Sequence, residues 1–525
     1  MREFNVEGVC NSNENYMVDI TGKLEKIKGL VDRGKYFTIN RGRQYGKTTT
    51  LSMLRRFLAD EYVVISISFE GWGETAYSTE EKFCQEFLIS IQRALEVSGC
   101  SKVESEKWLD ESIATFPALS RHVTSICRDA PTNYVLMIDE VDKASNQMVF
   151  LNFLGKLRDK YIARKDDRDY TFHSVILAGV YDIKNIKLKL LKEGIYVRSN
   201  DNEGMQNSPW NIAAYFDVDM SFSPTEIKTM LVAYEADYKT GMSTVDVASE
   251  IYNFTGGYPI LVSYICLLIH EKLAQDWTIA GVRAAVKLLM RIEIPIFESL
   301  IKNLNNDEEL SNLVYHVLMV GTPWPFDIYD PLINLGVRYG HFKEVDNKVR
   351  VANKIFEIRL THYFTSKAIR ERIQKDPFAL ANSEGVIDQG RLNMEACLKK
   401  FACYYEKYHG DADLDFIERH CGLVFLMFIS SIINGSGFAI CESQSRDGKI
   451  RDILITYLDQ LFVVELKIWY GQKRHERAYA QLAGYMDKEQ LDAGYLLTFD
   501  SRKTKKRHQK WVELDNGKKI FDVLV

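Results

Sequence analysis

The sequence predicts an α/β multidomain protein, and three observations support this class. The chain has 525 residues, which is too long for one hydrophobic core and corresponds to about three or four units. Over the first 220 residues, short apolar strands alternate with amphipathic helices, as in a parallel sheet that is covered on both faces. A second group of strands follows a helical stretch, between residues 437 and 499.

Composition excludes several classes of protein. A content of 46% hydrophobic and 12% aromatic residues excludes a disordered chain. The net charge of −5 predicts no chain-wide nucleic-acid surface, so any such surface is local. The apolar stretches at 258–269 and 421–433 are shorter than the roughly 20 residues that span a bilayer. The start of the chain has no apolar signal core, and nine cysteines without a C-x-x-C pair indicate reduced thiols. We therefore expect a cytoplasmic protein.

The first domain is expected at residues 1–220 as a doubly wound α/β unit. Its strands are short, apolar and rich in β-branched or aromatic residues, at 36–39, 62–69, 134–138 and 174–178. Between the second and third strands, Ser78 and Glu81 have the spacing of a capping box at a helix start.

Residues 221–375 are expected to be mainly helical. Ser223, Pro224 and Glu226 have the N-cap, N1 and N3 positions of a helix start. A hairpin is predicted from 342–345 and 348–351, with its turn at residues 346–347. We divide this region into a helical lid at 221–300 and a winged-helix-like module at 301–375.

The last domain is expected at residues 391–525, after a charged linker at about 366–390. It begins with helices and continues into a mixed α/β core. The expected elements are strands at 437–442, 452–457, 461–467 and 493–499, with a helix at about 477–487.

Residues 41–48 lie directly between the first strand and a helix, which is the position of a phosphate-binding loop. Gly46 permits close approach of the backbone, Lys47 is expected to reach the β and γ phosphates, and Thr48 to ligate Mg²⁺. The strict motif begins with glycine where this chain has Arg41, so an ordinary helix-opening turn is the alternative. The residues expected around the nucleotide are Arg41, Gly42, Arg43, Gln44, Tyr45, Gly46, Lys47, Thr48, Thr49 and Asp139.

The second half of this site is an apolar strand that ends in Asp139 and Glu140, about 90 residues downstream. Asp139 is expected to hold Mg²⁺ through water, and Glu140 to polarise the water that attacks the γ-phosphate. The order and spacing of the two segments predict a site that binds and hydrolyses ATP.

A second constellation lies in the C-terminal strands. Glu465 and Lys467 are two residues apart on one strand, so their side chains share a face. Asp452 opens the preceding strand, and Glu442 ends the strand before it as a further metal-side acid. Two carboxylates can hold Mg²⁺ or Mn²⁺ beside a scissile phosphate, while a lysine activates water. This pattern resembles the PD-(D/E)xK nuclease core, which has a restriction-endonuclease-like fold; the alternative is a cross-strand ion pair on a solvated face.

The following helix strengthens that resemblance. Gln481 and Tyr485 lie four residues apart on one face, like the Gln-x-x-x-Tyr element of RecB-like members. Glu418 lies where many members place a further acid. The predicted catalytic group of this domain is Asp452, Glu465, Lys467, Gln481 and Tyr485.

DNA is the expected substrate of the C-terminal domain. The tail at 502–510 holds six basic residues and no acid, and Trp511 follows it. These residues are expected to contact phosphates, with an ordinary solvated loop as the alternative.

Segments along nearly the whole chain resemble bacterial AAA-ATPase-like proteins that carry a C-terminal nuclease-fold domain. They lie at residues 4–5, 16–19, 34–37, 43–48, 179–183, 208–212 and 257–259. In that family the loop begins with arginine, so Arg41 agrees with it. The resemblance implies base or ribose contacts by Tyr16 and Asp19, with a capped helix start as the alternative, and a polar sensor at Asp182. Arg198 is the candidate arginine finger.

These features together predict an ATP-hydrolysing P-loop NTPase whose C-terminal domain is a Mg²⁺-dependent DNA nuclease controlled by the nucleotide state. A role in defence or mobile-element biology is implied by the resemblance alone. Two alternatives are a nucleotide-gated DNA-binding switch with a catalytically silent nuclease fold, and an ATPase that drives assembly of a homo-oligomer. The ten histidines show no ligand spacing, so we expect no transition-metal site, and we expect His475 to be exposed.

Overall fold

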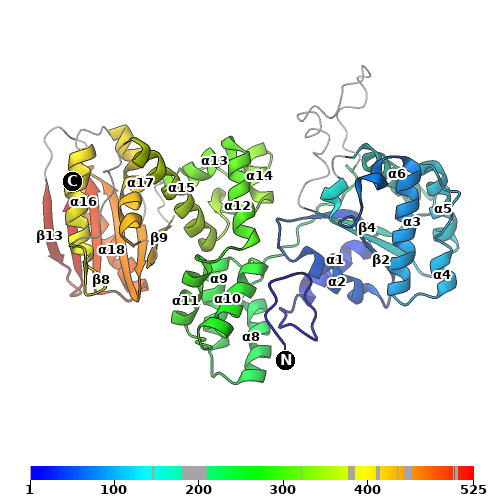
Figure 1. Ribbon diagram of the computed structural model, residues 1–525, viewed down its shortest axis with the longest axis horizontal. Coiled ribbons are helices and arrows are strands. Elements are labelled where there is room, and N and C mark those ends of the chain that lie inside the picture. Colours follow the sequence, from blue (N-terminus) through cyan, green and yellow to red (C-terminus); the bar gives the residue numbers. More distant parts are fainter. Residues whose placement is uncertain are drawn as a thin grey trace, which may run out of the picture. The chain divides into compact units, whose positions relative to one another are not determined.

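The computed structural model describes residues 2–144, 147–179, 210–320, 322–375, 385–409, 414–433, 436–442, 452–500, 502 and 507–525. Figure 1 shows the helices and strands along the chain, which forms two compact units. The first comprises Met1–Tyr252 with Gly257–Leu267, and the second Asn253–Gly256 with Leu268–Val525. Among the described residues, no helix is long and apolar enough to cross a membrane.

The first unit contains a parallel sheet in the order β1-β4-β3-β2. Its strands are β1 (Tyr36–Asn40), β2 (Val63–Ser68), β3 (Tyr134–Asp139) and β4 (Ser174–Gly179). All residues of β3 and β4 are buried, as their apolar sequences predict for strands covered on both faces. A parallel bridge between Phe37 and Ala214 extends the sheet beyond β1.

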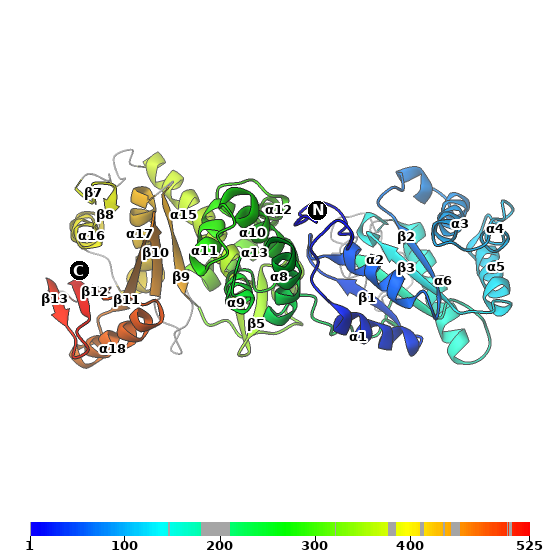
Figure 2. The same cartoon turned by 90° about the horizontal axis from the view of Figure 1, so that it is seen from below.

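Helices lie on both faces of this sheet (Figure 2). They are α1 (Thr21–Asp32), α2 (Lys47–Leu58), α3 (Glu80–Val97), α4 (Lys102–Glu106), α5 (Phe116–Arg128) and α6 (Met148–Lys165). Helix α3 starts one residue later than its expected cap, because Thr79 and not Ser78 accepts a hydrogen bond from the Lys82 backbone N–H. The predicted capping box at Ser78 is therefore wrong, although the apolar face of the helix is buried as expected.

The helical region begins with α8 (Pro224–Tyr238), α9 (Thr244–Thr255) and α10 (Pro259–Lys272). The cap predicted for α8 is present: Ser223 Oγ accepts from the Glu226 N–H, and the Glu226 carboxylate accepts from the Ser223 N–H at 2.7 Å. Before α10, Gly257 has a φ of 75°, and a Cβ at this position would lie 2.0 Å from the Phe222 carbonyl oxygen. Only glycine permits this close approach.

The second unit continues with α11 (Ile279–Leu289), α12 (Pro295–Asn306), α13 (Glu308–Tyr315), α14 (Pro331–Arg338) and α15 (Lys354–Lys375). The predicted hairpin is confirmed: β5 (Phe342–Val345) pairs antiparallel with β6 (Lys348–Val351). Asp346 and Asn347 both have positive φ, as a two-residue hairpin turn requires. The assignment of this region as a winged-helix-like module stays a prediction. The expected linker at 366–390 is helical at its start, because α15 continues to Lys375.

The C-terminal sheet has six strands in the order β13-β14-β12-β11-β10-β9. They are β9 (Gly437–Glu442), β10 (Asp452–Tyr457), β11 (Gln460–Ile468), β12 (Ala493–Phe499), β13 (His508–Glu513) and β14 (Lys519–Leu524). Strands β11, β12 and β14 run parallel, and the other pairs are antiparallel.

Helices also cover both faces of this second sheet (Figure 2). Helix α18 (Gln472–Lys488) connects β11 to β12, and its Leu482 packs with Val463 and Leu496 on one face. Helices α16 (Met394–His409) and α17 (Leu414–Ile433) pack on the other, where the rings of Phe401 and Phe499 lie 6.2 Å apart. Short strands β7 (Ile387–Asp388) and β8 (Arg391–Leu392) precede α16.

Candidate functional site

The loop after β1 has the backbone of an anion-binding turn. Gly46 is the N-cap of α2 with a φ of 75°, and Gln44 also has positive φ. The free N–H groups at the start of α2 carry the positive end of the helix dipole, so this end of the helix can hold a phosphate. The guanidinium of Arg41 is engaged by backbone groups, because it donates to the carbonyls of Asn40 and Val218 at 2.9 and 3.0 Å.

Lys47 lies inside this loop. Its Nζ donates to the carbonyl oxygens of Arg41 and Gly42, each at 3.1 Å, and the residue is buried. Burial lowers the pKa of Lys47, and the nearby carboxylates of Glu140 and Asp139 oppose that shift. The cation is thus held where a phosphate would replace the two carbonyl partners.

Thr48 and Asp139 lie side by side. The Thr48 hydroxyl donates to Asp139 Oδ2 at 2.7 Å, which joins the first turn of α2 to the end of β3. Thr48 is placed to ligate Mg²⁺ directly, and Asp139 beside it can hold a water of the same ion, because Mg²⁺ keeps several of its waters when it binds to proteins. Two neighbouring oxygen donors of this kind fit a magnesium site.

Glu140 follows directly, with a φ of 53°. Its N–H donates to Asp139 Oδ1 at 2.9 Å, so this backbone turn is tied to the neighbouring carboxylate. Burial and the charge of Asp139 raise the pKa of Glu140. A carboxylate with a raised proton affinity is suited to general-base chemistry.

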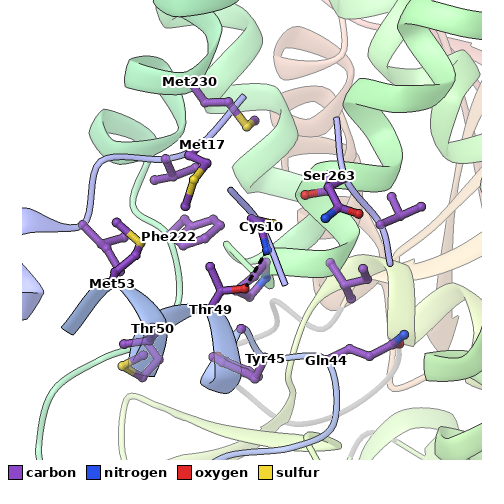
Figure 3. A pocket seen from close by; sticks show the side chains of 18 of the residues that line it. Cys10, Met17, Gln44, Tyr45, Thr49, Thr50, Met53, Phe222, Met230 and Ser263 are labelled. Atoms are coloured by element: carbon purple, nitrogen blue, oxygen red, sulfur yellow. Dashed lines mark hydrogen bonds between the residues drawn. The ribbon is translucent and has the colours of Figure 1, made fainter. Parts of the chain in front are cut away.

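A cavity of about 150 Å³ opens beside the loop, between the N-terminal segment, α2, α8 and α10 (Figure 3). Its wall is mainly apolar and includes Met17, Met53, Phe222 and Met230, with Ser263 from α10. An apolar cavity next to a phosphate loop is suited to a nucleobase. The predicted residues Gln44, Tyr45, Gly46 and Thr49 line the same cavity.

An aromatic pair fixes this side of the loop. The Tyr258 hydroxyl donates to the Arg43 carbonyl at 2.6 Å. The Tyr45 ring lies edge-on to the Tyr258 ring, with the ring centroids 4.5 Å apart. Tyr45 also exchanges a hydrogen bond with Ser221 at 2.8 Å. These contacts give the segment at 257–259 a structural role in shaping the loop.

Of the two residues expected to contact the base or ribose, Tyr16 lies at the cavity and Asp19 accepts hydrogen bonds at the start of a helix. Tyr16 lies in the cavity wall, and its hydroxyl donates to Asp237 at 2.7 Å. Asp19 instead accepts from the backbone and hydroxyl of Thr21, at 2.9 and 2.6 Å, at the start of α1. The apolar residues of the wall were missed in the sequence, because they come from distant helices and have no motif of their own. Asp182 and Arg198 lie outside the described residues.

The register of the C-terminal sheet aligns three predicted acids. Asp452 on β10 pairs with Glu465 on β11 and with Glu442 on β9, so the three residues occupy one row across the sheet. Lys467 Nζ lies 2.6 Å from Glu465 Oε1 and donates to Gln481 Oε1 at 3.1 Å. The structure therefore brings Glu465, Lys467 and Gln481 into contact.

The other predicted residues of this domain are Tyr485, the further acids and the basic tail. Tyr485 packs against the apolar cluster beneath α18. The side chains of Asp452, Glu442 and Glu418 are not among those that the structure describes. In the basic tail, Arg502 pairs with Asp500 at 2.7 Å, and residues 503–506 lie outside the described residues.

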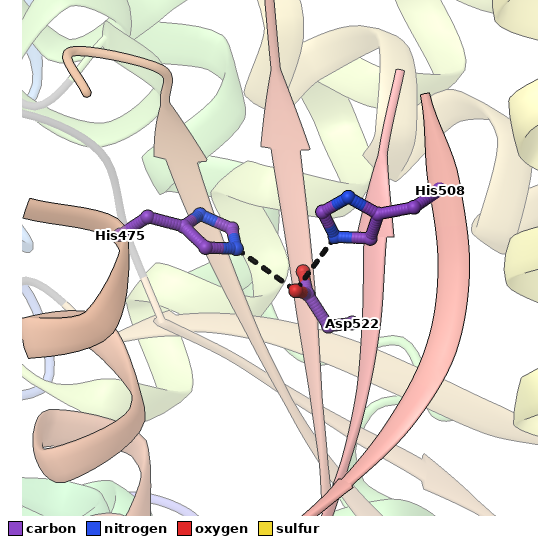
Figure 4. Close-up of side chains that lie close together, drawn as sticks. All are labelled: His475, His508 and Asp522. Atoms are coloured by element: carbon purple, nitrogen blue, oxygen red, sulfur yellow. Dashed lines mark hydrogen bonds and ion pairs between the residues drawn. The ribbon is translucent and has the colours of Figure 1, made fainter. Parts of the chain in front are cut away.

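His475 is not exposed, contrary to our expectation. It is 5% exposed and lies in a group with His508 and Asp522 (Figure 4). Its burial follows from its place on the face of α18 that packs on the sheet. The three residues are far apart along the chain, so they form no ligand spacing that can be recognised in the sequence.

A curated relative, an uncharacterized WD repeat-containing protein of Synechocystis sp., is 25% identical over 246 residues. The match covers 46% of this chain and 19% of the relative, so it spans less than a fifth of the length of that protein.

Two solved structures are similar to this chain at low sequence identity. A Walker-type ATPase of Pyrococcus abyssi has a TM-score of 0.47 and 13% identity, covering 68% of this chain and 99% of that one. Cdc6p of Pyrobaculum aerophilum has a TM-score of 0.30 and 14% identity, covering 69% and 97%. The family model described as "AAA-like domain" matches residues 7–357, and the chain therefore belongs to the AAA-like domain family.

Proposed function

We propose that the protein binds ATP with Mg²⁺ in the first unit and hydrolyses it. The observation that carries this proposal is the contact of Thr48 with Asp139, 2.7 Å apart, beside the buried Lys47. The two oxygen donors that can bind Mg²⁺ and the ammonium group of Lys47 thus lie together at the start of α2. That combination is the one that phosphoryl transfer from a nucleoside triphosphate requires.

Each group has a defined role in this proposal. The α2 N-terminus and Lys47 hold the β and γ phosphates, and the apolar cavity takes the base. Thr48 and Asp139 hold Mg²⁺, which supplies charge neutralisation on the phosphate oxygens when it is bound. Glu140 accepts the proton of the attacking water.

We infer that the C-terminal domain is a metal-dependent nuclease acting on DNA. The support is the row of Glu442, Asp452 and Glu465 across β9, β10 and β11, with Lys467 beside it. Three antiparallel strands, a crossover helix and a parallel strand follow one another in the order expected from the sequence of this domain. The proposed domains are the ATPase core at 1–220, the lid at 221–300, the winged-helix-like module at 301–375 and the nuclease domain at 391–525.

A paired experiment tests both parts. We expect Glu140→Gln to retain ATP binding and lose ATP turnover, while DNA cleavage is measured separately with Mg²⁺ and Mn²⁺. We expect Glu465→Gln to lose cleavage and keep ATP turnover. Glu513→Gln, an exposed substitution in the same domain, is the matched control and leaves both activities unchanged. Normal turnover in Glu140→Gln would show that Glu140 is only a carboxylate at the end of a strand, whereas absence of ATP turnover in wild type would refute the ATPase assignment.

A second candidate is a nucleotide-gated DNA-binding switch with a silent nuclease fold. The observation that favours it is the burial of Glu465, whose side chain is 0% exposed and paired with Lys467. A metal ion that bound Glu465 through Oε1 would have to compete with the Lys467 ammonium, which lies 2.6 Å from that oxygen. Nucleotide-dependent DNA binding without cleavage, with either metal and with single- or double-stranded DNA, would select this candidate.

A further inference from the structure

A group of two imidazoles and a carboxylate lies in the C-terminal domain, apart from the residues of the proposed nuclease. His475 comes from α18, His508 from the start of β13, and Asp522 from β14. Their potential ligand atoms all lie within 4.8 Å of one another. Figure 4 shows both rings directed at the same carboxylate.

The contacts within the group converge on one oxygen. His475 Nε2 lies 2.8 Å and His508 Nε2 lies 2.7 Å from Asp522 Oδ2, and the Tyr479 hydroxyl donates to the same oxygen at 2.7 Å. The second oxygen of Asp522 is buried and accepts no hydrogen bond from the described residues. A buried carboxylate with one crowded and one unused oxygen has coordination capacity left over.

The surroundings are those of a metal-binding histidine. His475 Nδ1 lies 3.3 Å from the Thr498 hydroxyl, a partner that can fix the ring orientation while the other nitrogen binds an ion. The side chains of Asp522 and His475 are 0% and 3% exposed, and that of His508 is 27% exposed. The group is therefore anchored on one side and accessible on the other.

We propose that His475, His508 and Asp522 bind one Zn²⁺ ion, with water as the fourth ligand. Imidazole and carboxylate are ligands that Zn²⁺ uses, whereas Mg²⁺ prefers oxygen ligands alone. Zinc bonds of about 2.0–2.1 Å in a tetrahedron place ligand atoms about 3.3 Å apart. The two N–O pairs therefore need to separate by only about half an ångström to admit the ion.

This site is separate from the proposed nuclease metal site. In the sheet, Glu465 pairs with Leu496, and Leu496 pairs with Asp522, so Asp522 is two strands from Glu465. Neighbouring strands lie about 4.8 Å apart, which gives a backbone separation of about 10 Å. The ion would join β13 and β14 to α18 and stabilise the far side of the domain.

Metal binding to the full-length protein tests this proposal. After chelator treatment and dialysis, we expect wild type to take up one more equivalent of Zn²⁺ than His508→Gln, counted by native mass spectrometry. We expect Co²⁺ to give wild type, but not the variant, the visible absorption of a tetrahedral site. Zn²⁺ should raise the unfolding temperature of wild type, and Mg²⁺ at the same concentration should not do so through this site.

Two variants serve as controls. Tyr479→Phe removes a hydrogen bond to Asp522 but leaves all three ligands, so we expect it to keep the zinc equivalent. Glu465→Gln should also keep it, which separates this proposal from the nuclease assignment. Equal zinc uptake by wild type and His508→Gln would overturn the proposal.

X-ray absorption at the zinc edge of wild type keeps the test decisive if His508→Gln fails to fold. We expect nitrogen and oxygen neighbours with imidazole scattering. A shell of sulfur neighbours would instead assign the bound zinc to cysteines such as the exposed Cys403 and refute the site.

Discussion

The Thr48 hydroxyl donates a 2.7 Å hydrogen bond to the Asp139 carboxylate across 91 positions of sequence. The contact joins the start of a helix to the end of a strand two places along the sheet from β1. In parallel α/β sheets, ligands bind at the carboxyl ends of the strands. The contact therefore marks the edge of the sheet where the proposed nucleotide chemistry takes place.

Replacing Lys47 should abolish nucleotide-dependent stabilisation. Lys47→Ala removes the cation that lies 3.1 Å from two loop carbonyls, where the phosphates would be bound. We expect the increase in unfolding temperature caused by Mg²⁺-ATP in wild type to be largely lost. The exposed Lys26→Ala is the control, and an undiminished shift in Lys47→Ala would contradict the assignment.

Filling the apolar cavity should weaken nucleotide binding. Ser263 lies in its wall, and Ser263→Trp would occupy space that the base needs. We expect at least a tenfold weaker affinity for ATP, measured by calorimetry, while inorganic triphosphate binding changes little. Ser249→Trp makes the same change at an exposed position of α9 and should leave ATP affinity intact. An unaffected affinity in Ser263→Trp would place the base elsewhere.

In the proposed nuclease domain, two substitutions should reduce DNA cleavage to different extents. Lys467→Ala removes a group in contact with Glu465 and Gln481, so we expect cleavage to fall by about 10²–10³-fold with metal binding retained. Tyr485→Phe should have a smaller effect, as a positioning contact would. Loss of metal binding in Lys467→Ala would show that the lysine has only a structural role at Glu465.

His341 should make the second unit less stable in mild acid. Burial lowers the pKa of His341 to about 3, and that of His362 to about 4. Above pH about 6.5 both folded and unfolded states are neutral at these positions. As the pH falls below that value, the unfolded state binds protons that the folded state excludes, so stability decreases down to the folded pKa.

The slope of this decrease can be measured by denaturant unfolding between pH 6 and about 4.5. We expect His341→Phe to reduce the loss of unfolding free energy by about 1.4 kcal/mol per pH unit, which is the contribution of one titrating group. His316→Phe, at an exposed histidine, should leave the slope unchanged. An identical slope in wild type and His341→Phe would mean that His341 is protonated in the folded state.

Local sequence determined much of this protein. The strands of the first sheet, the cap at Ser223 and the hairpin turn at residues 346–347 depend on neighbouring residues and so could be recognised directly. The cap before α3 was misplaced by one residue, because Ser78 and Thr79 both offer a hydroxyl and only the path of the backbone selects one. Four strands of the C-terminal sheet, β9 to β12, were also recognised, since their apolar patterns are local, but β13 and β14 were missed.

The loop at residues 41–48 and the acids of β9, β10 and β11 could be picked out of the sequence, because each motif lies within one segment or on strands that follow one another along the chain. The wall of the cavity could not, since Met17, Phe222 and Ser263 come from segments that only folding brings together. The same holds for His475, His508 and Asp522, which lie on three different elements. Apolar periodicity encodes which face of an element is buried, but strand order and helix packing decide which distant side chains share that face.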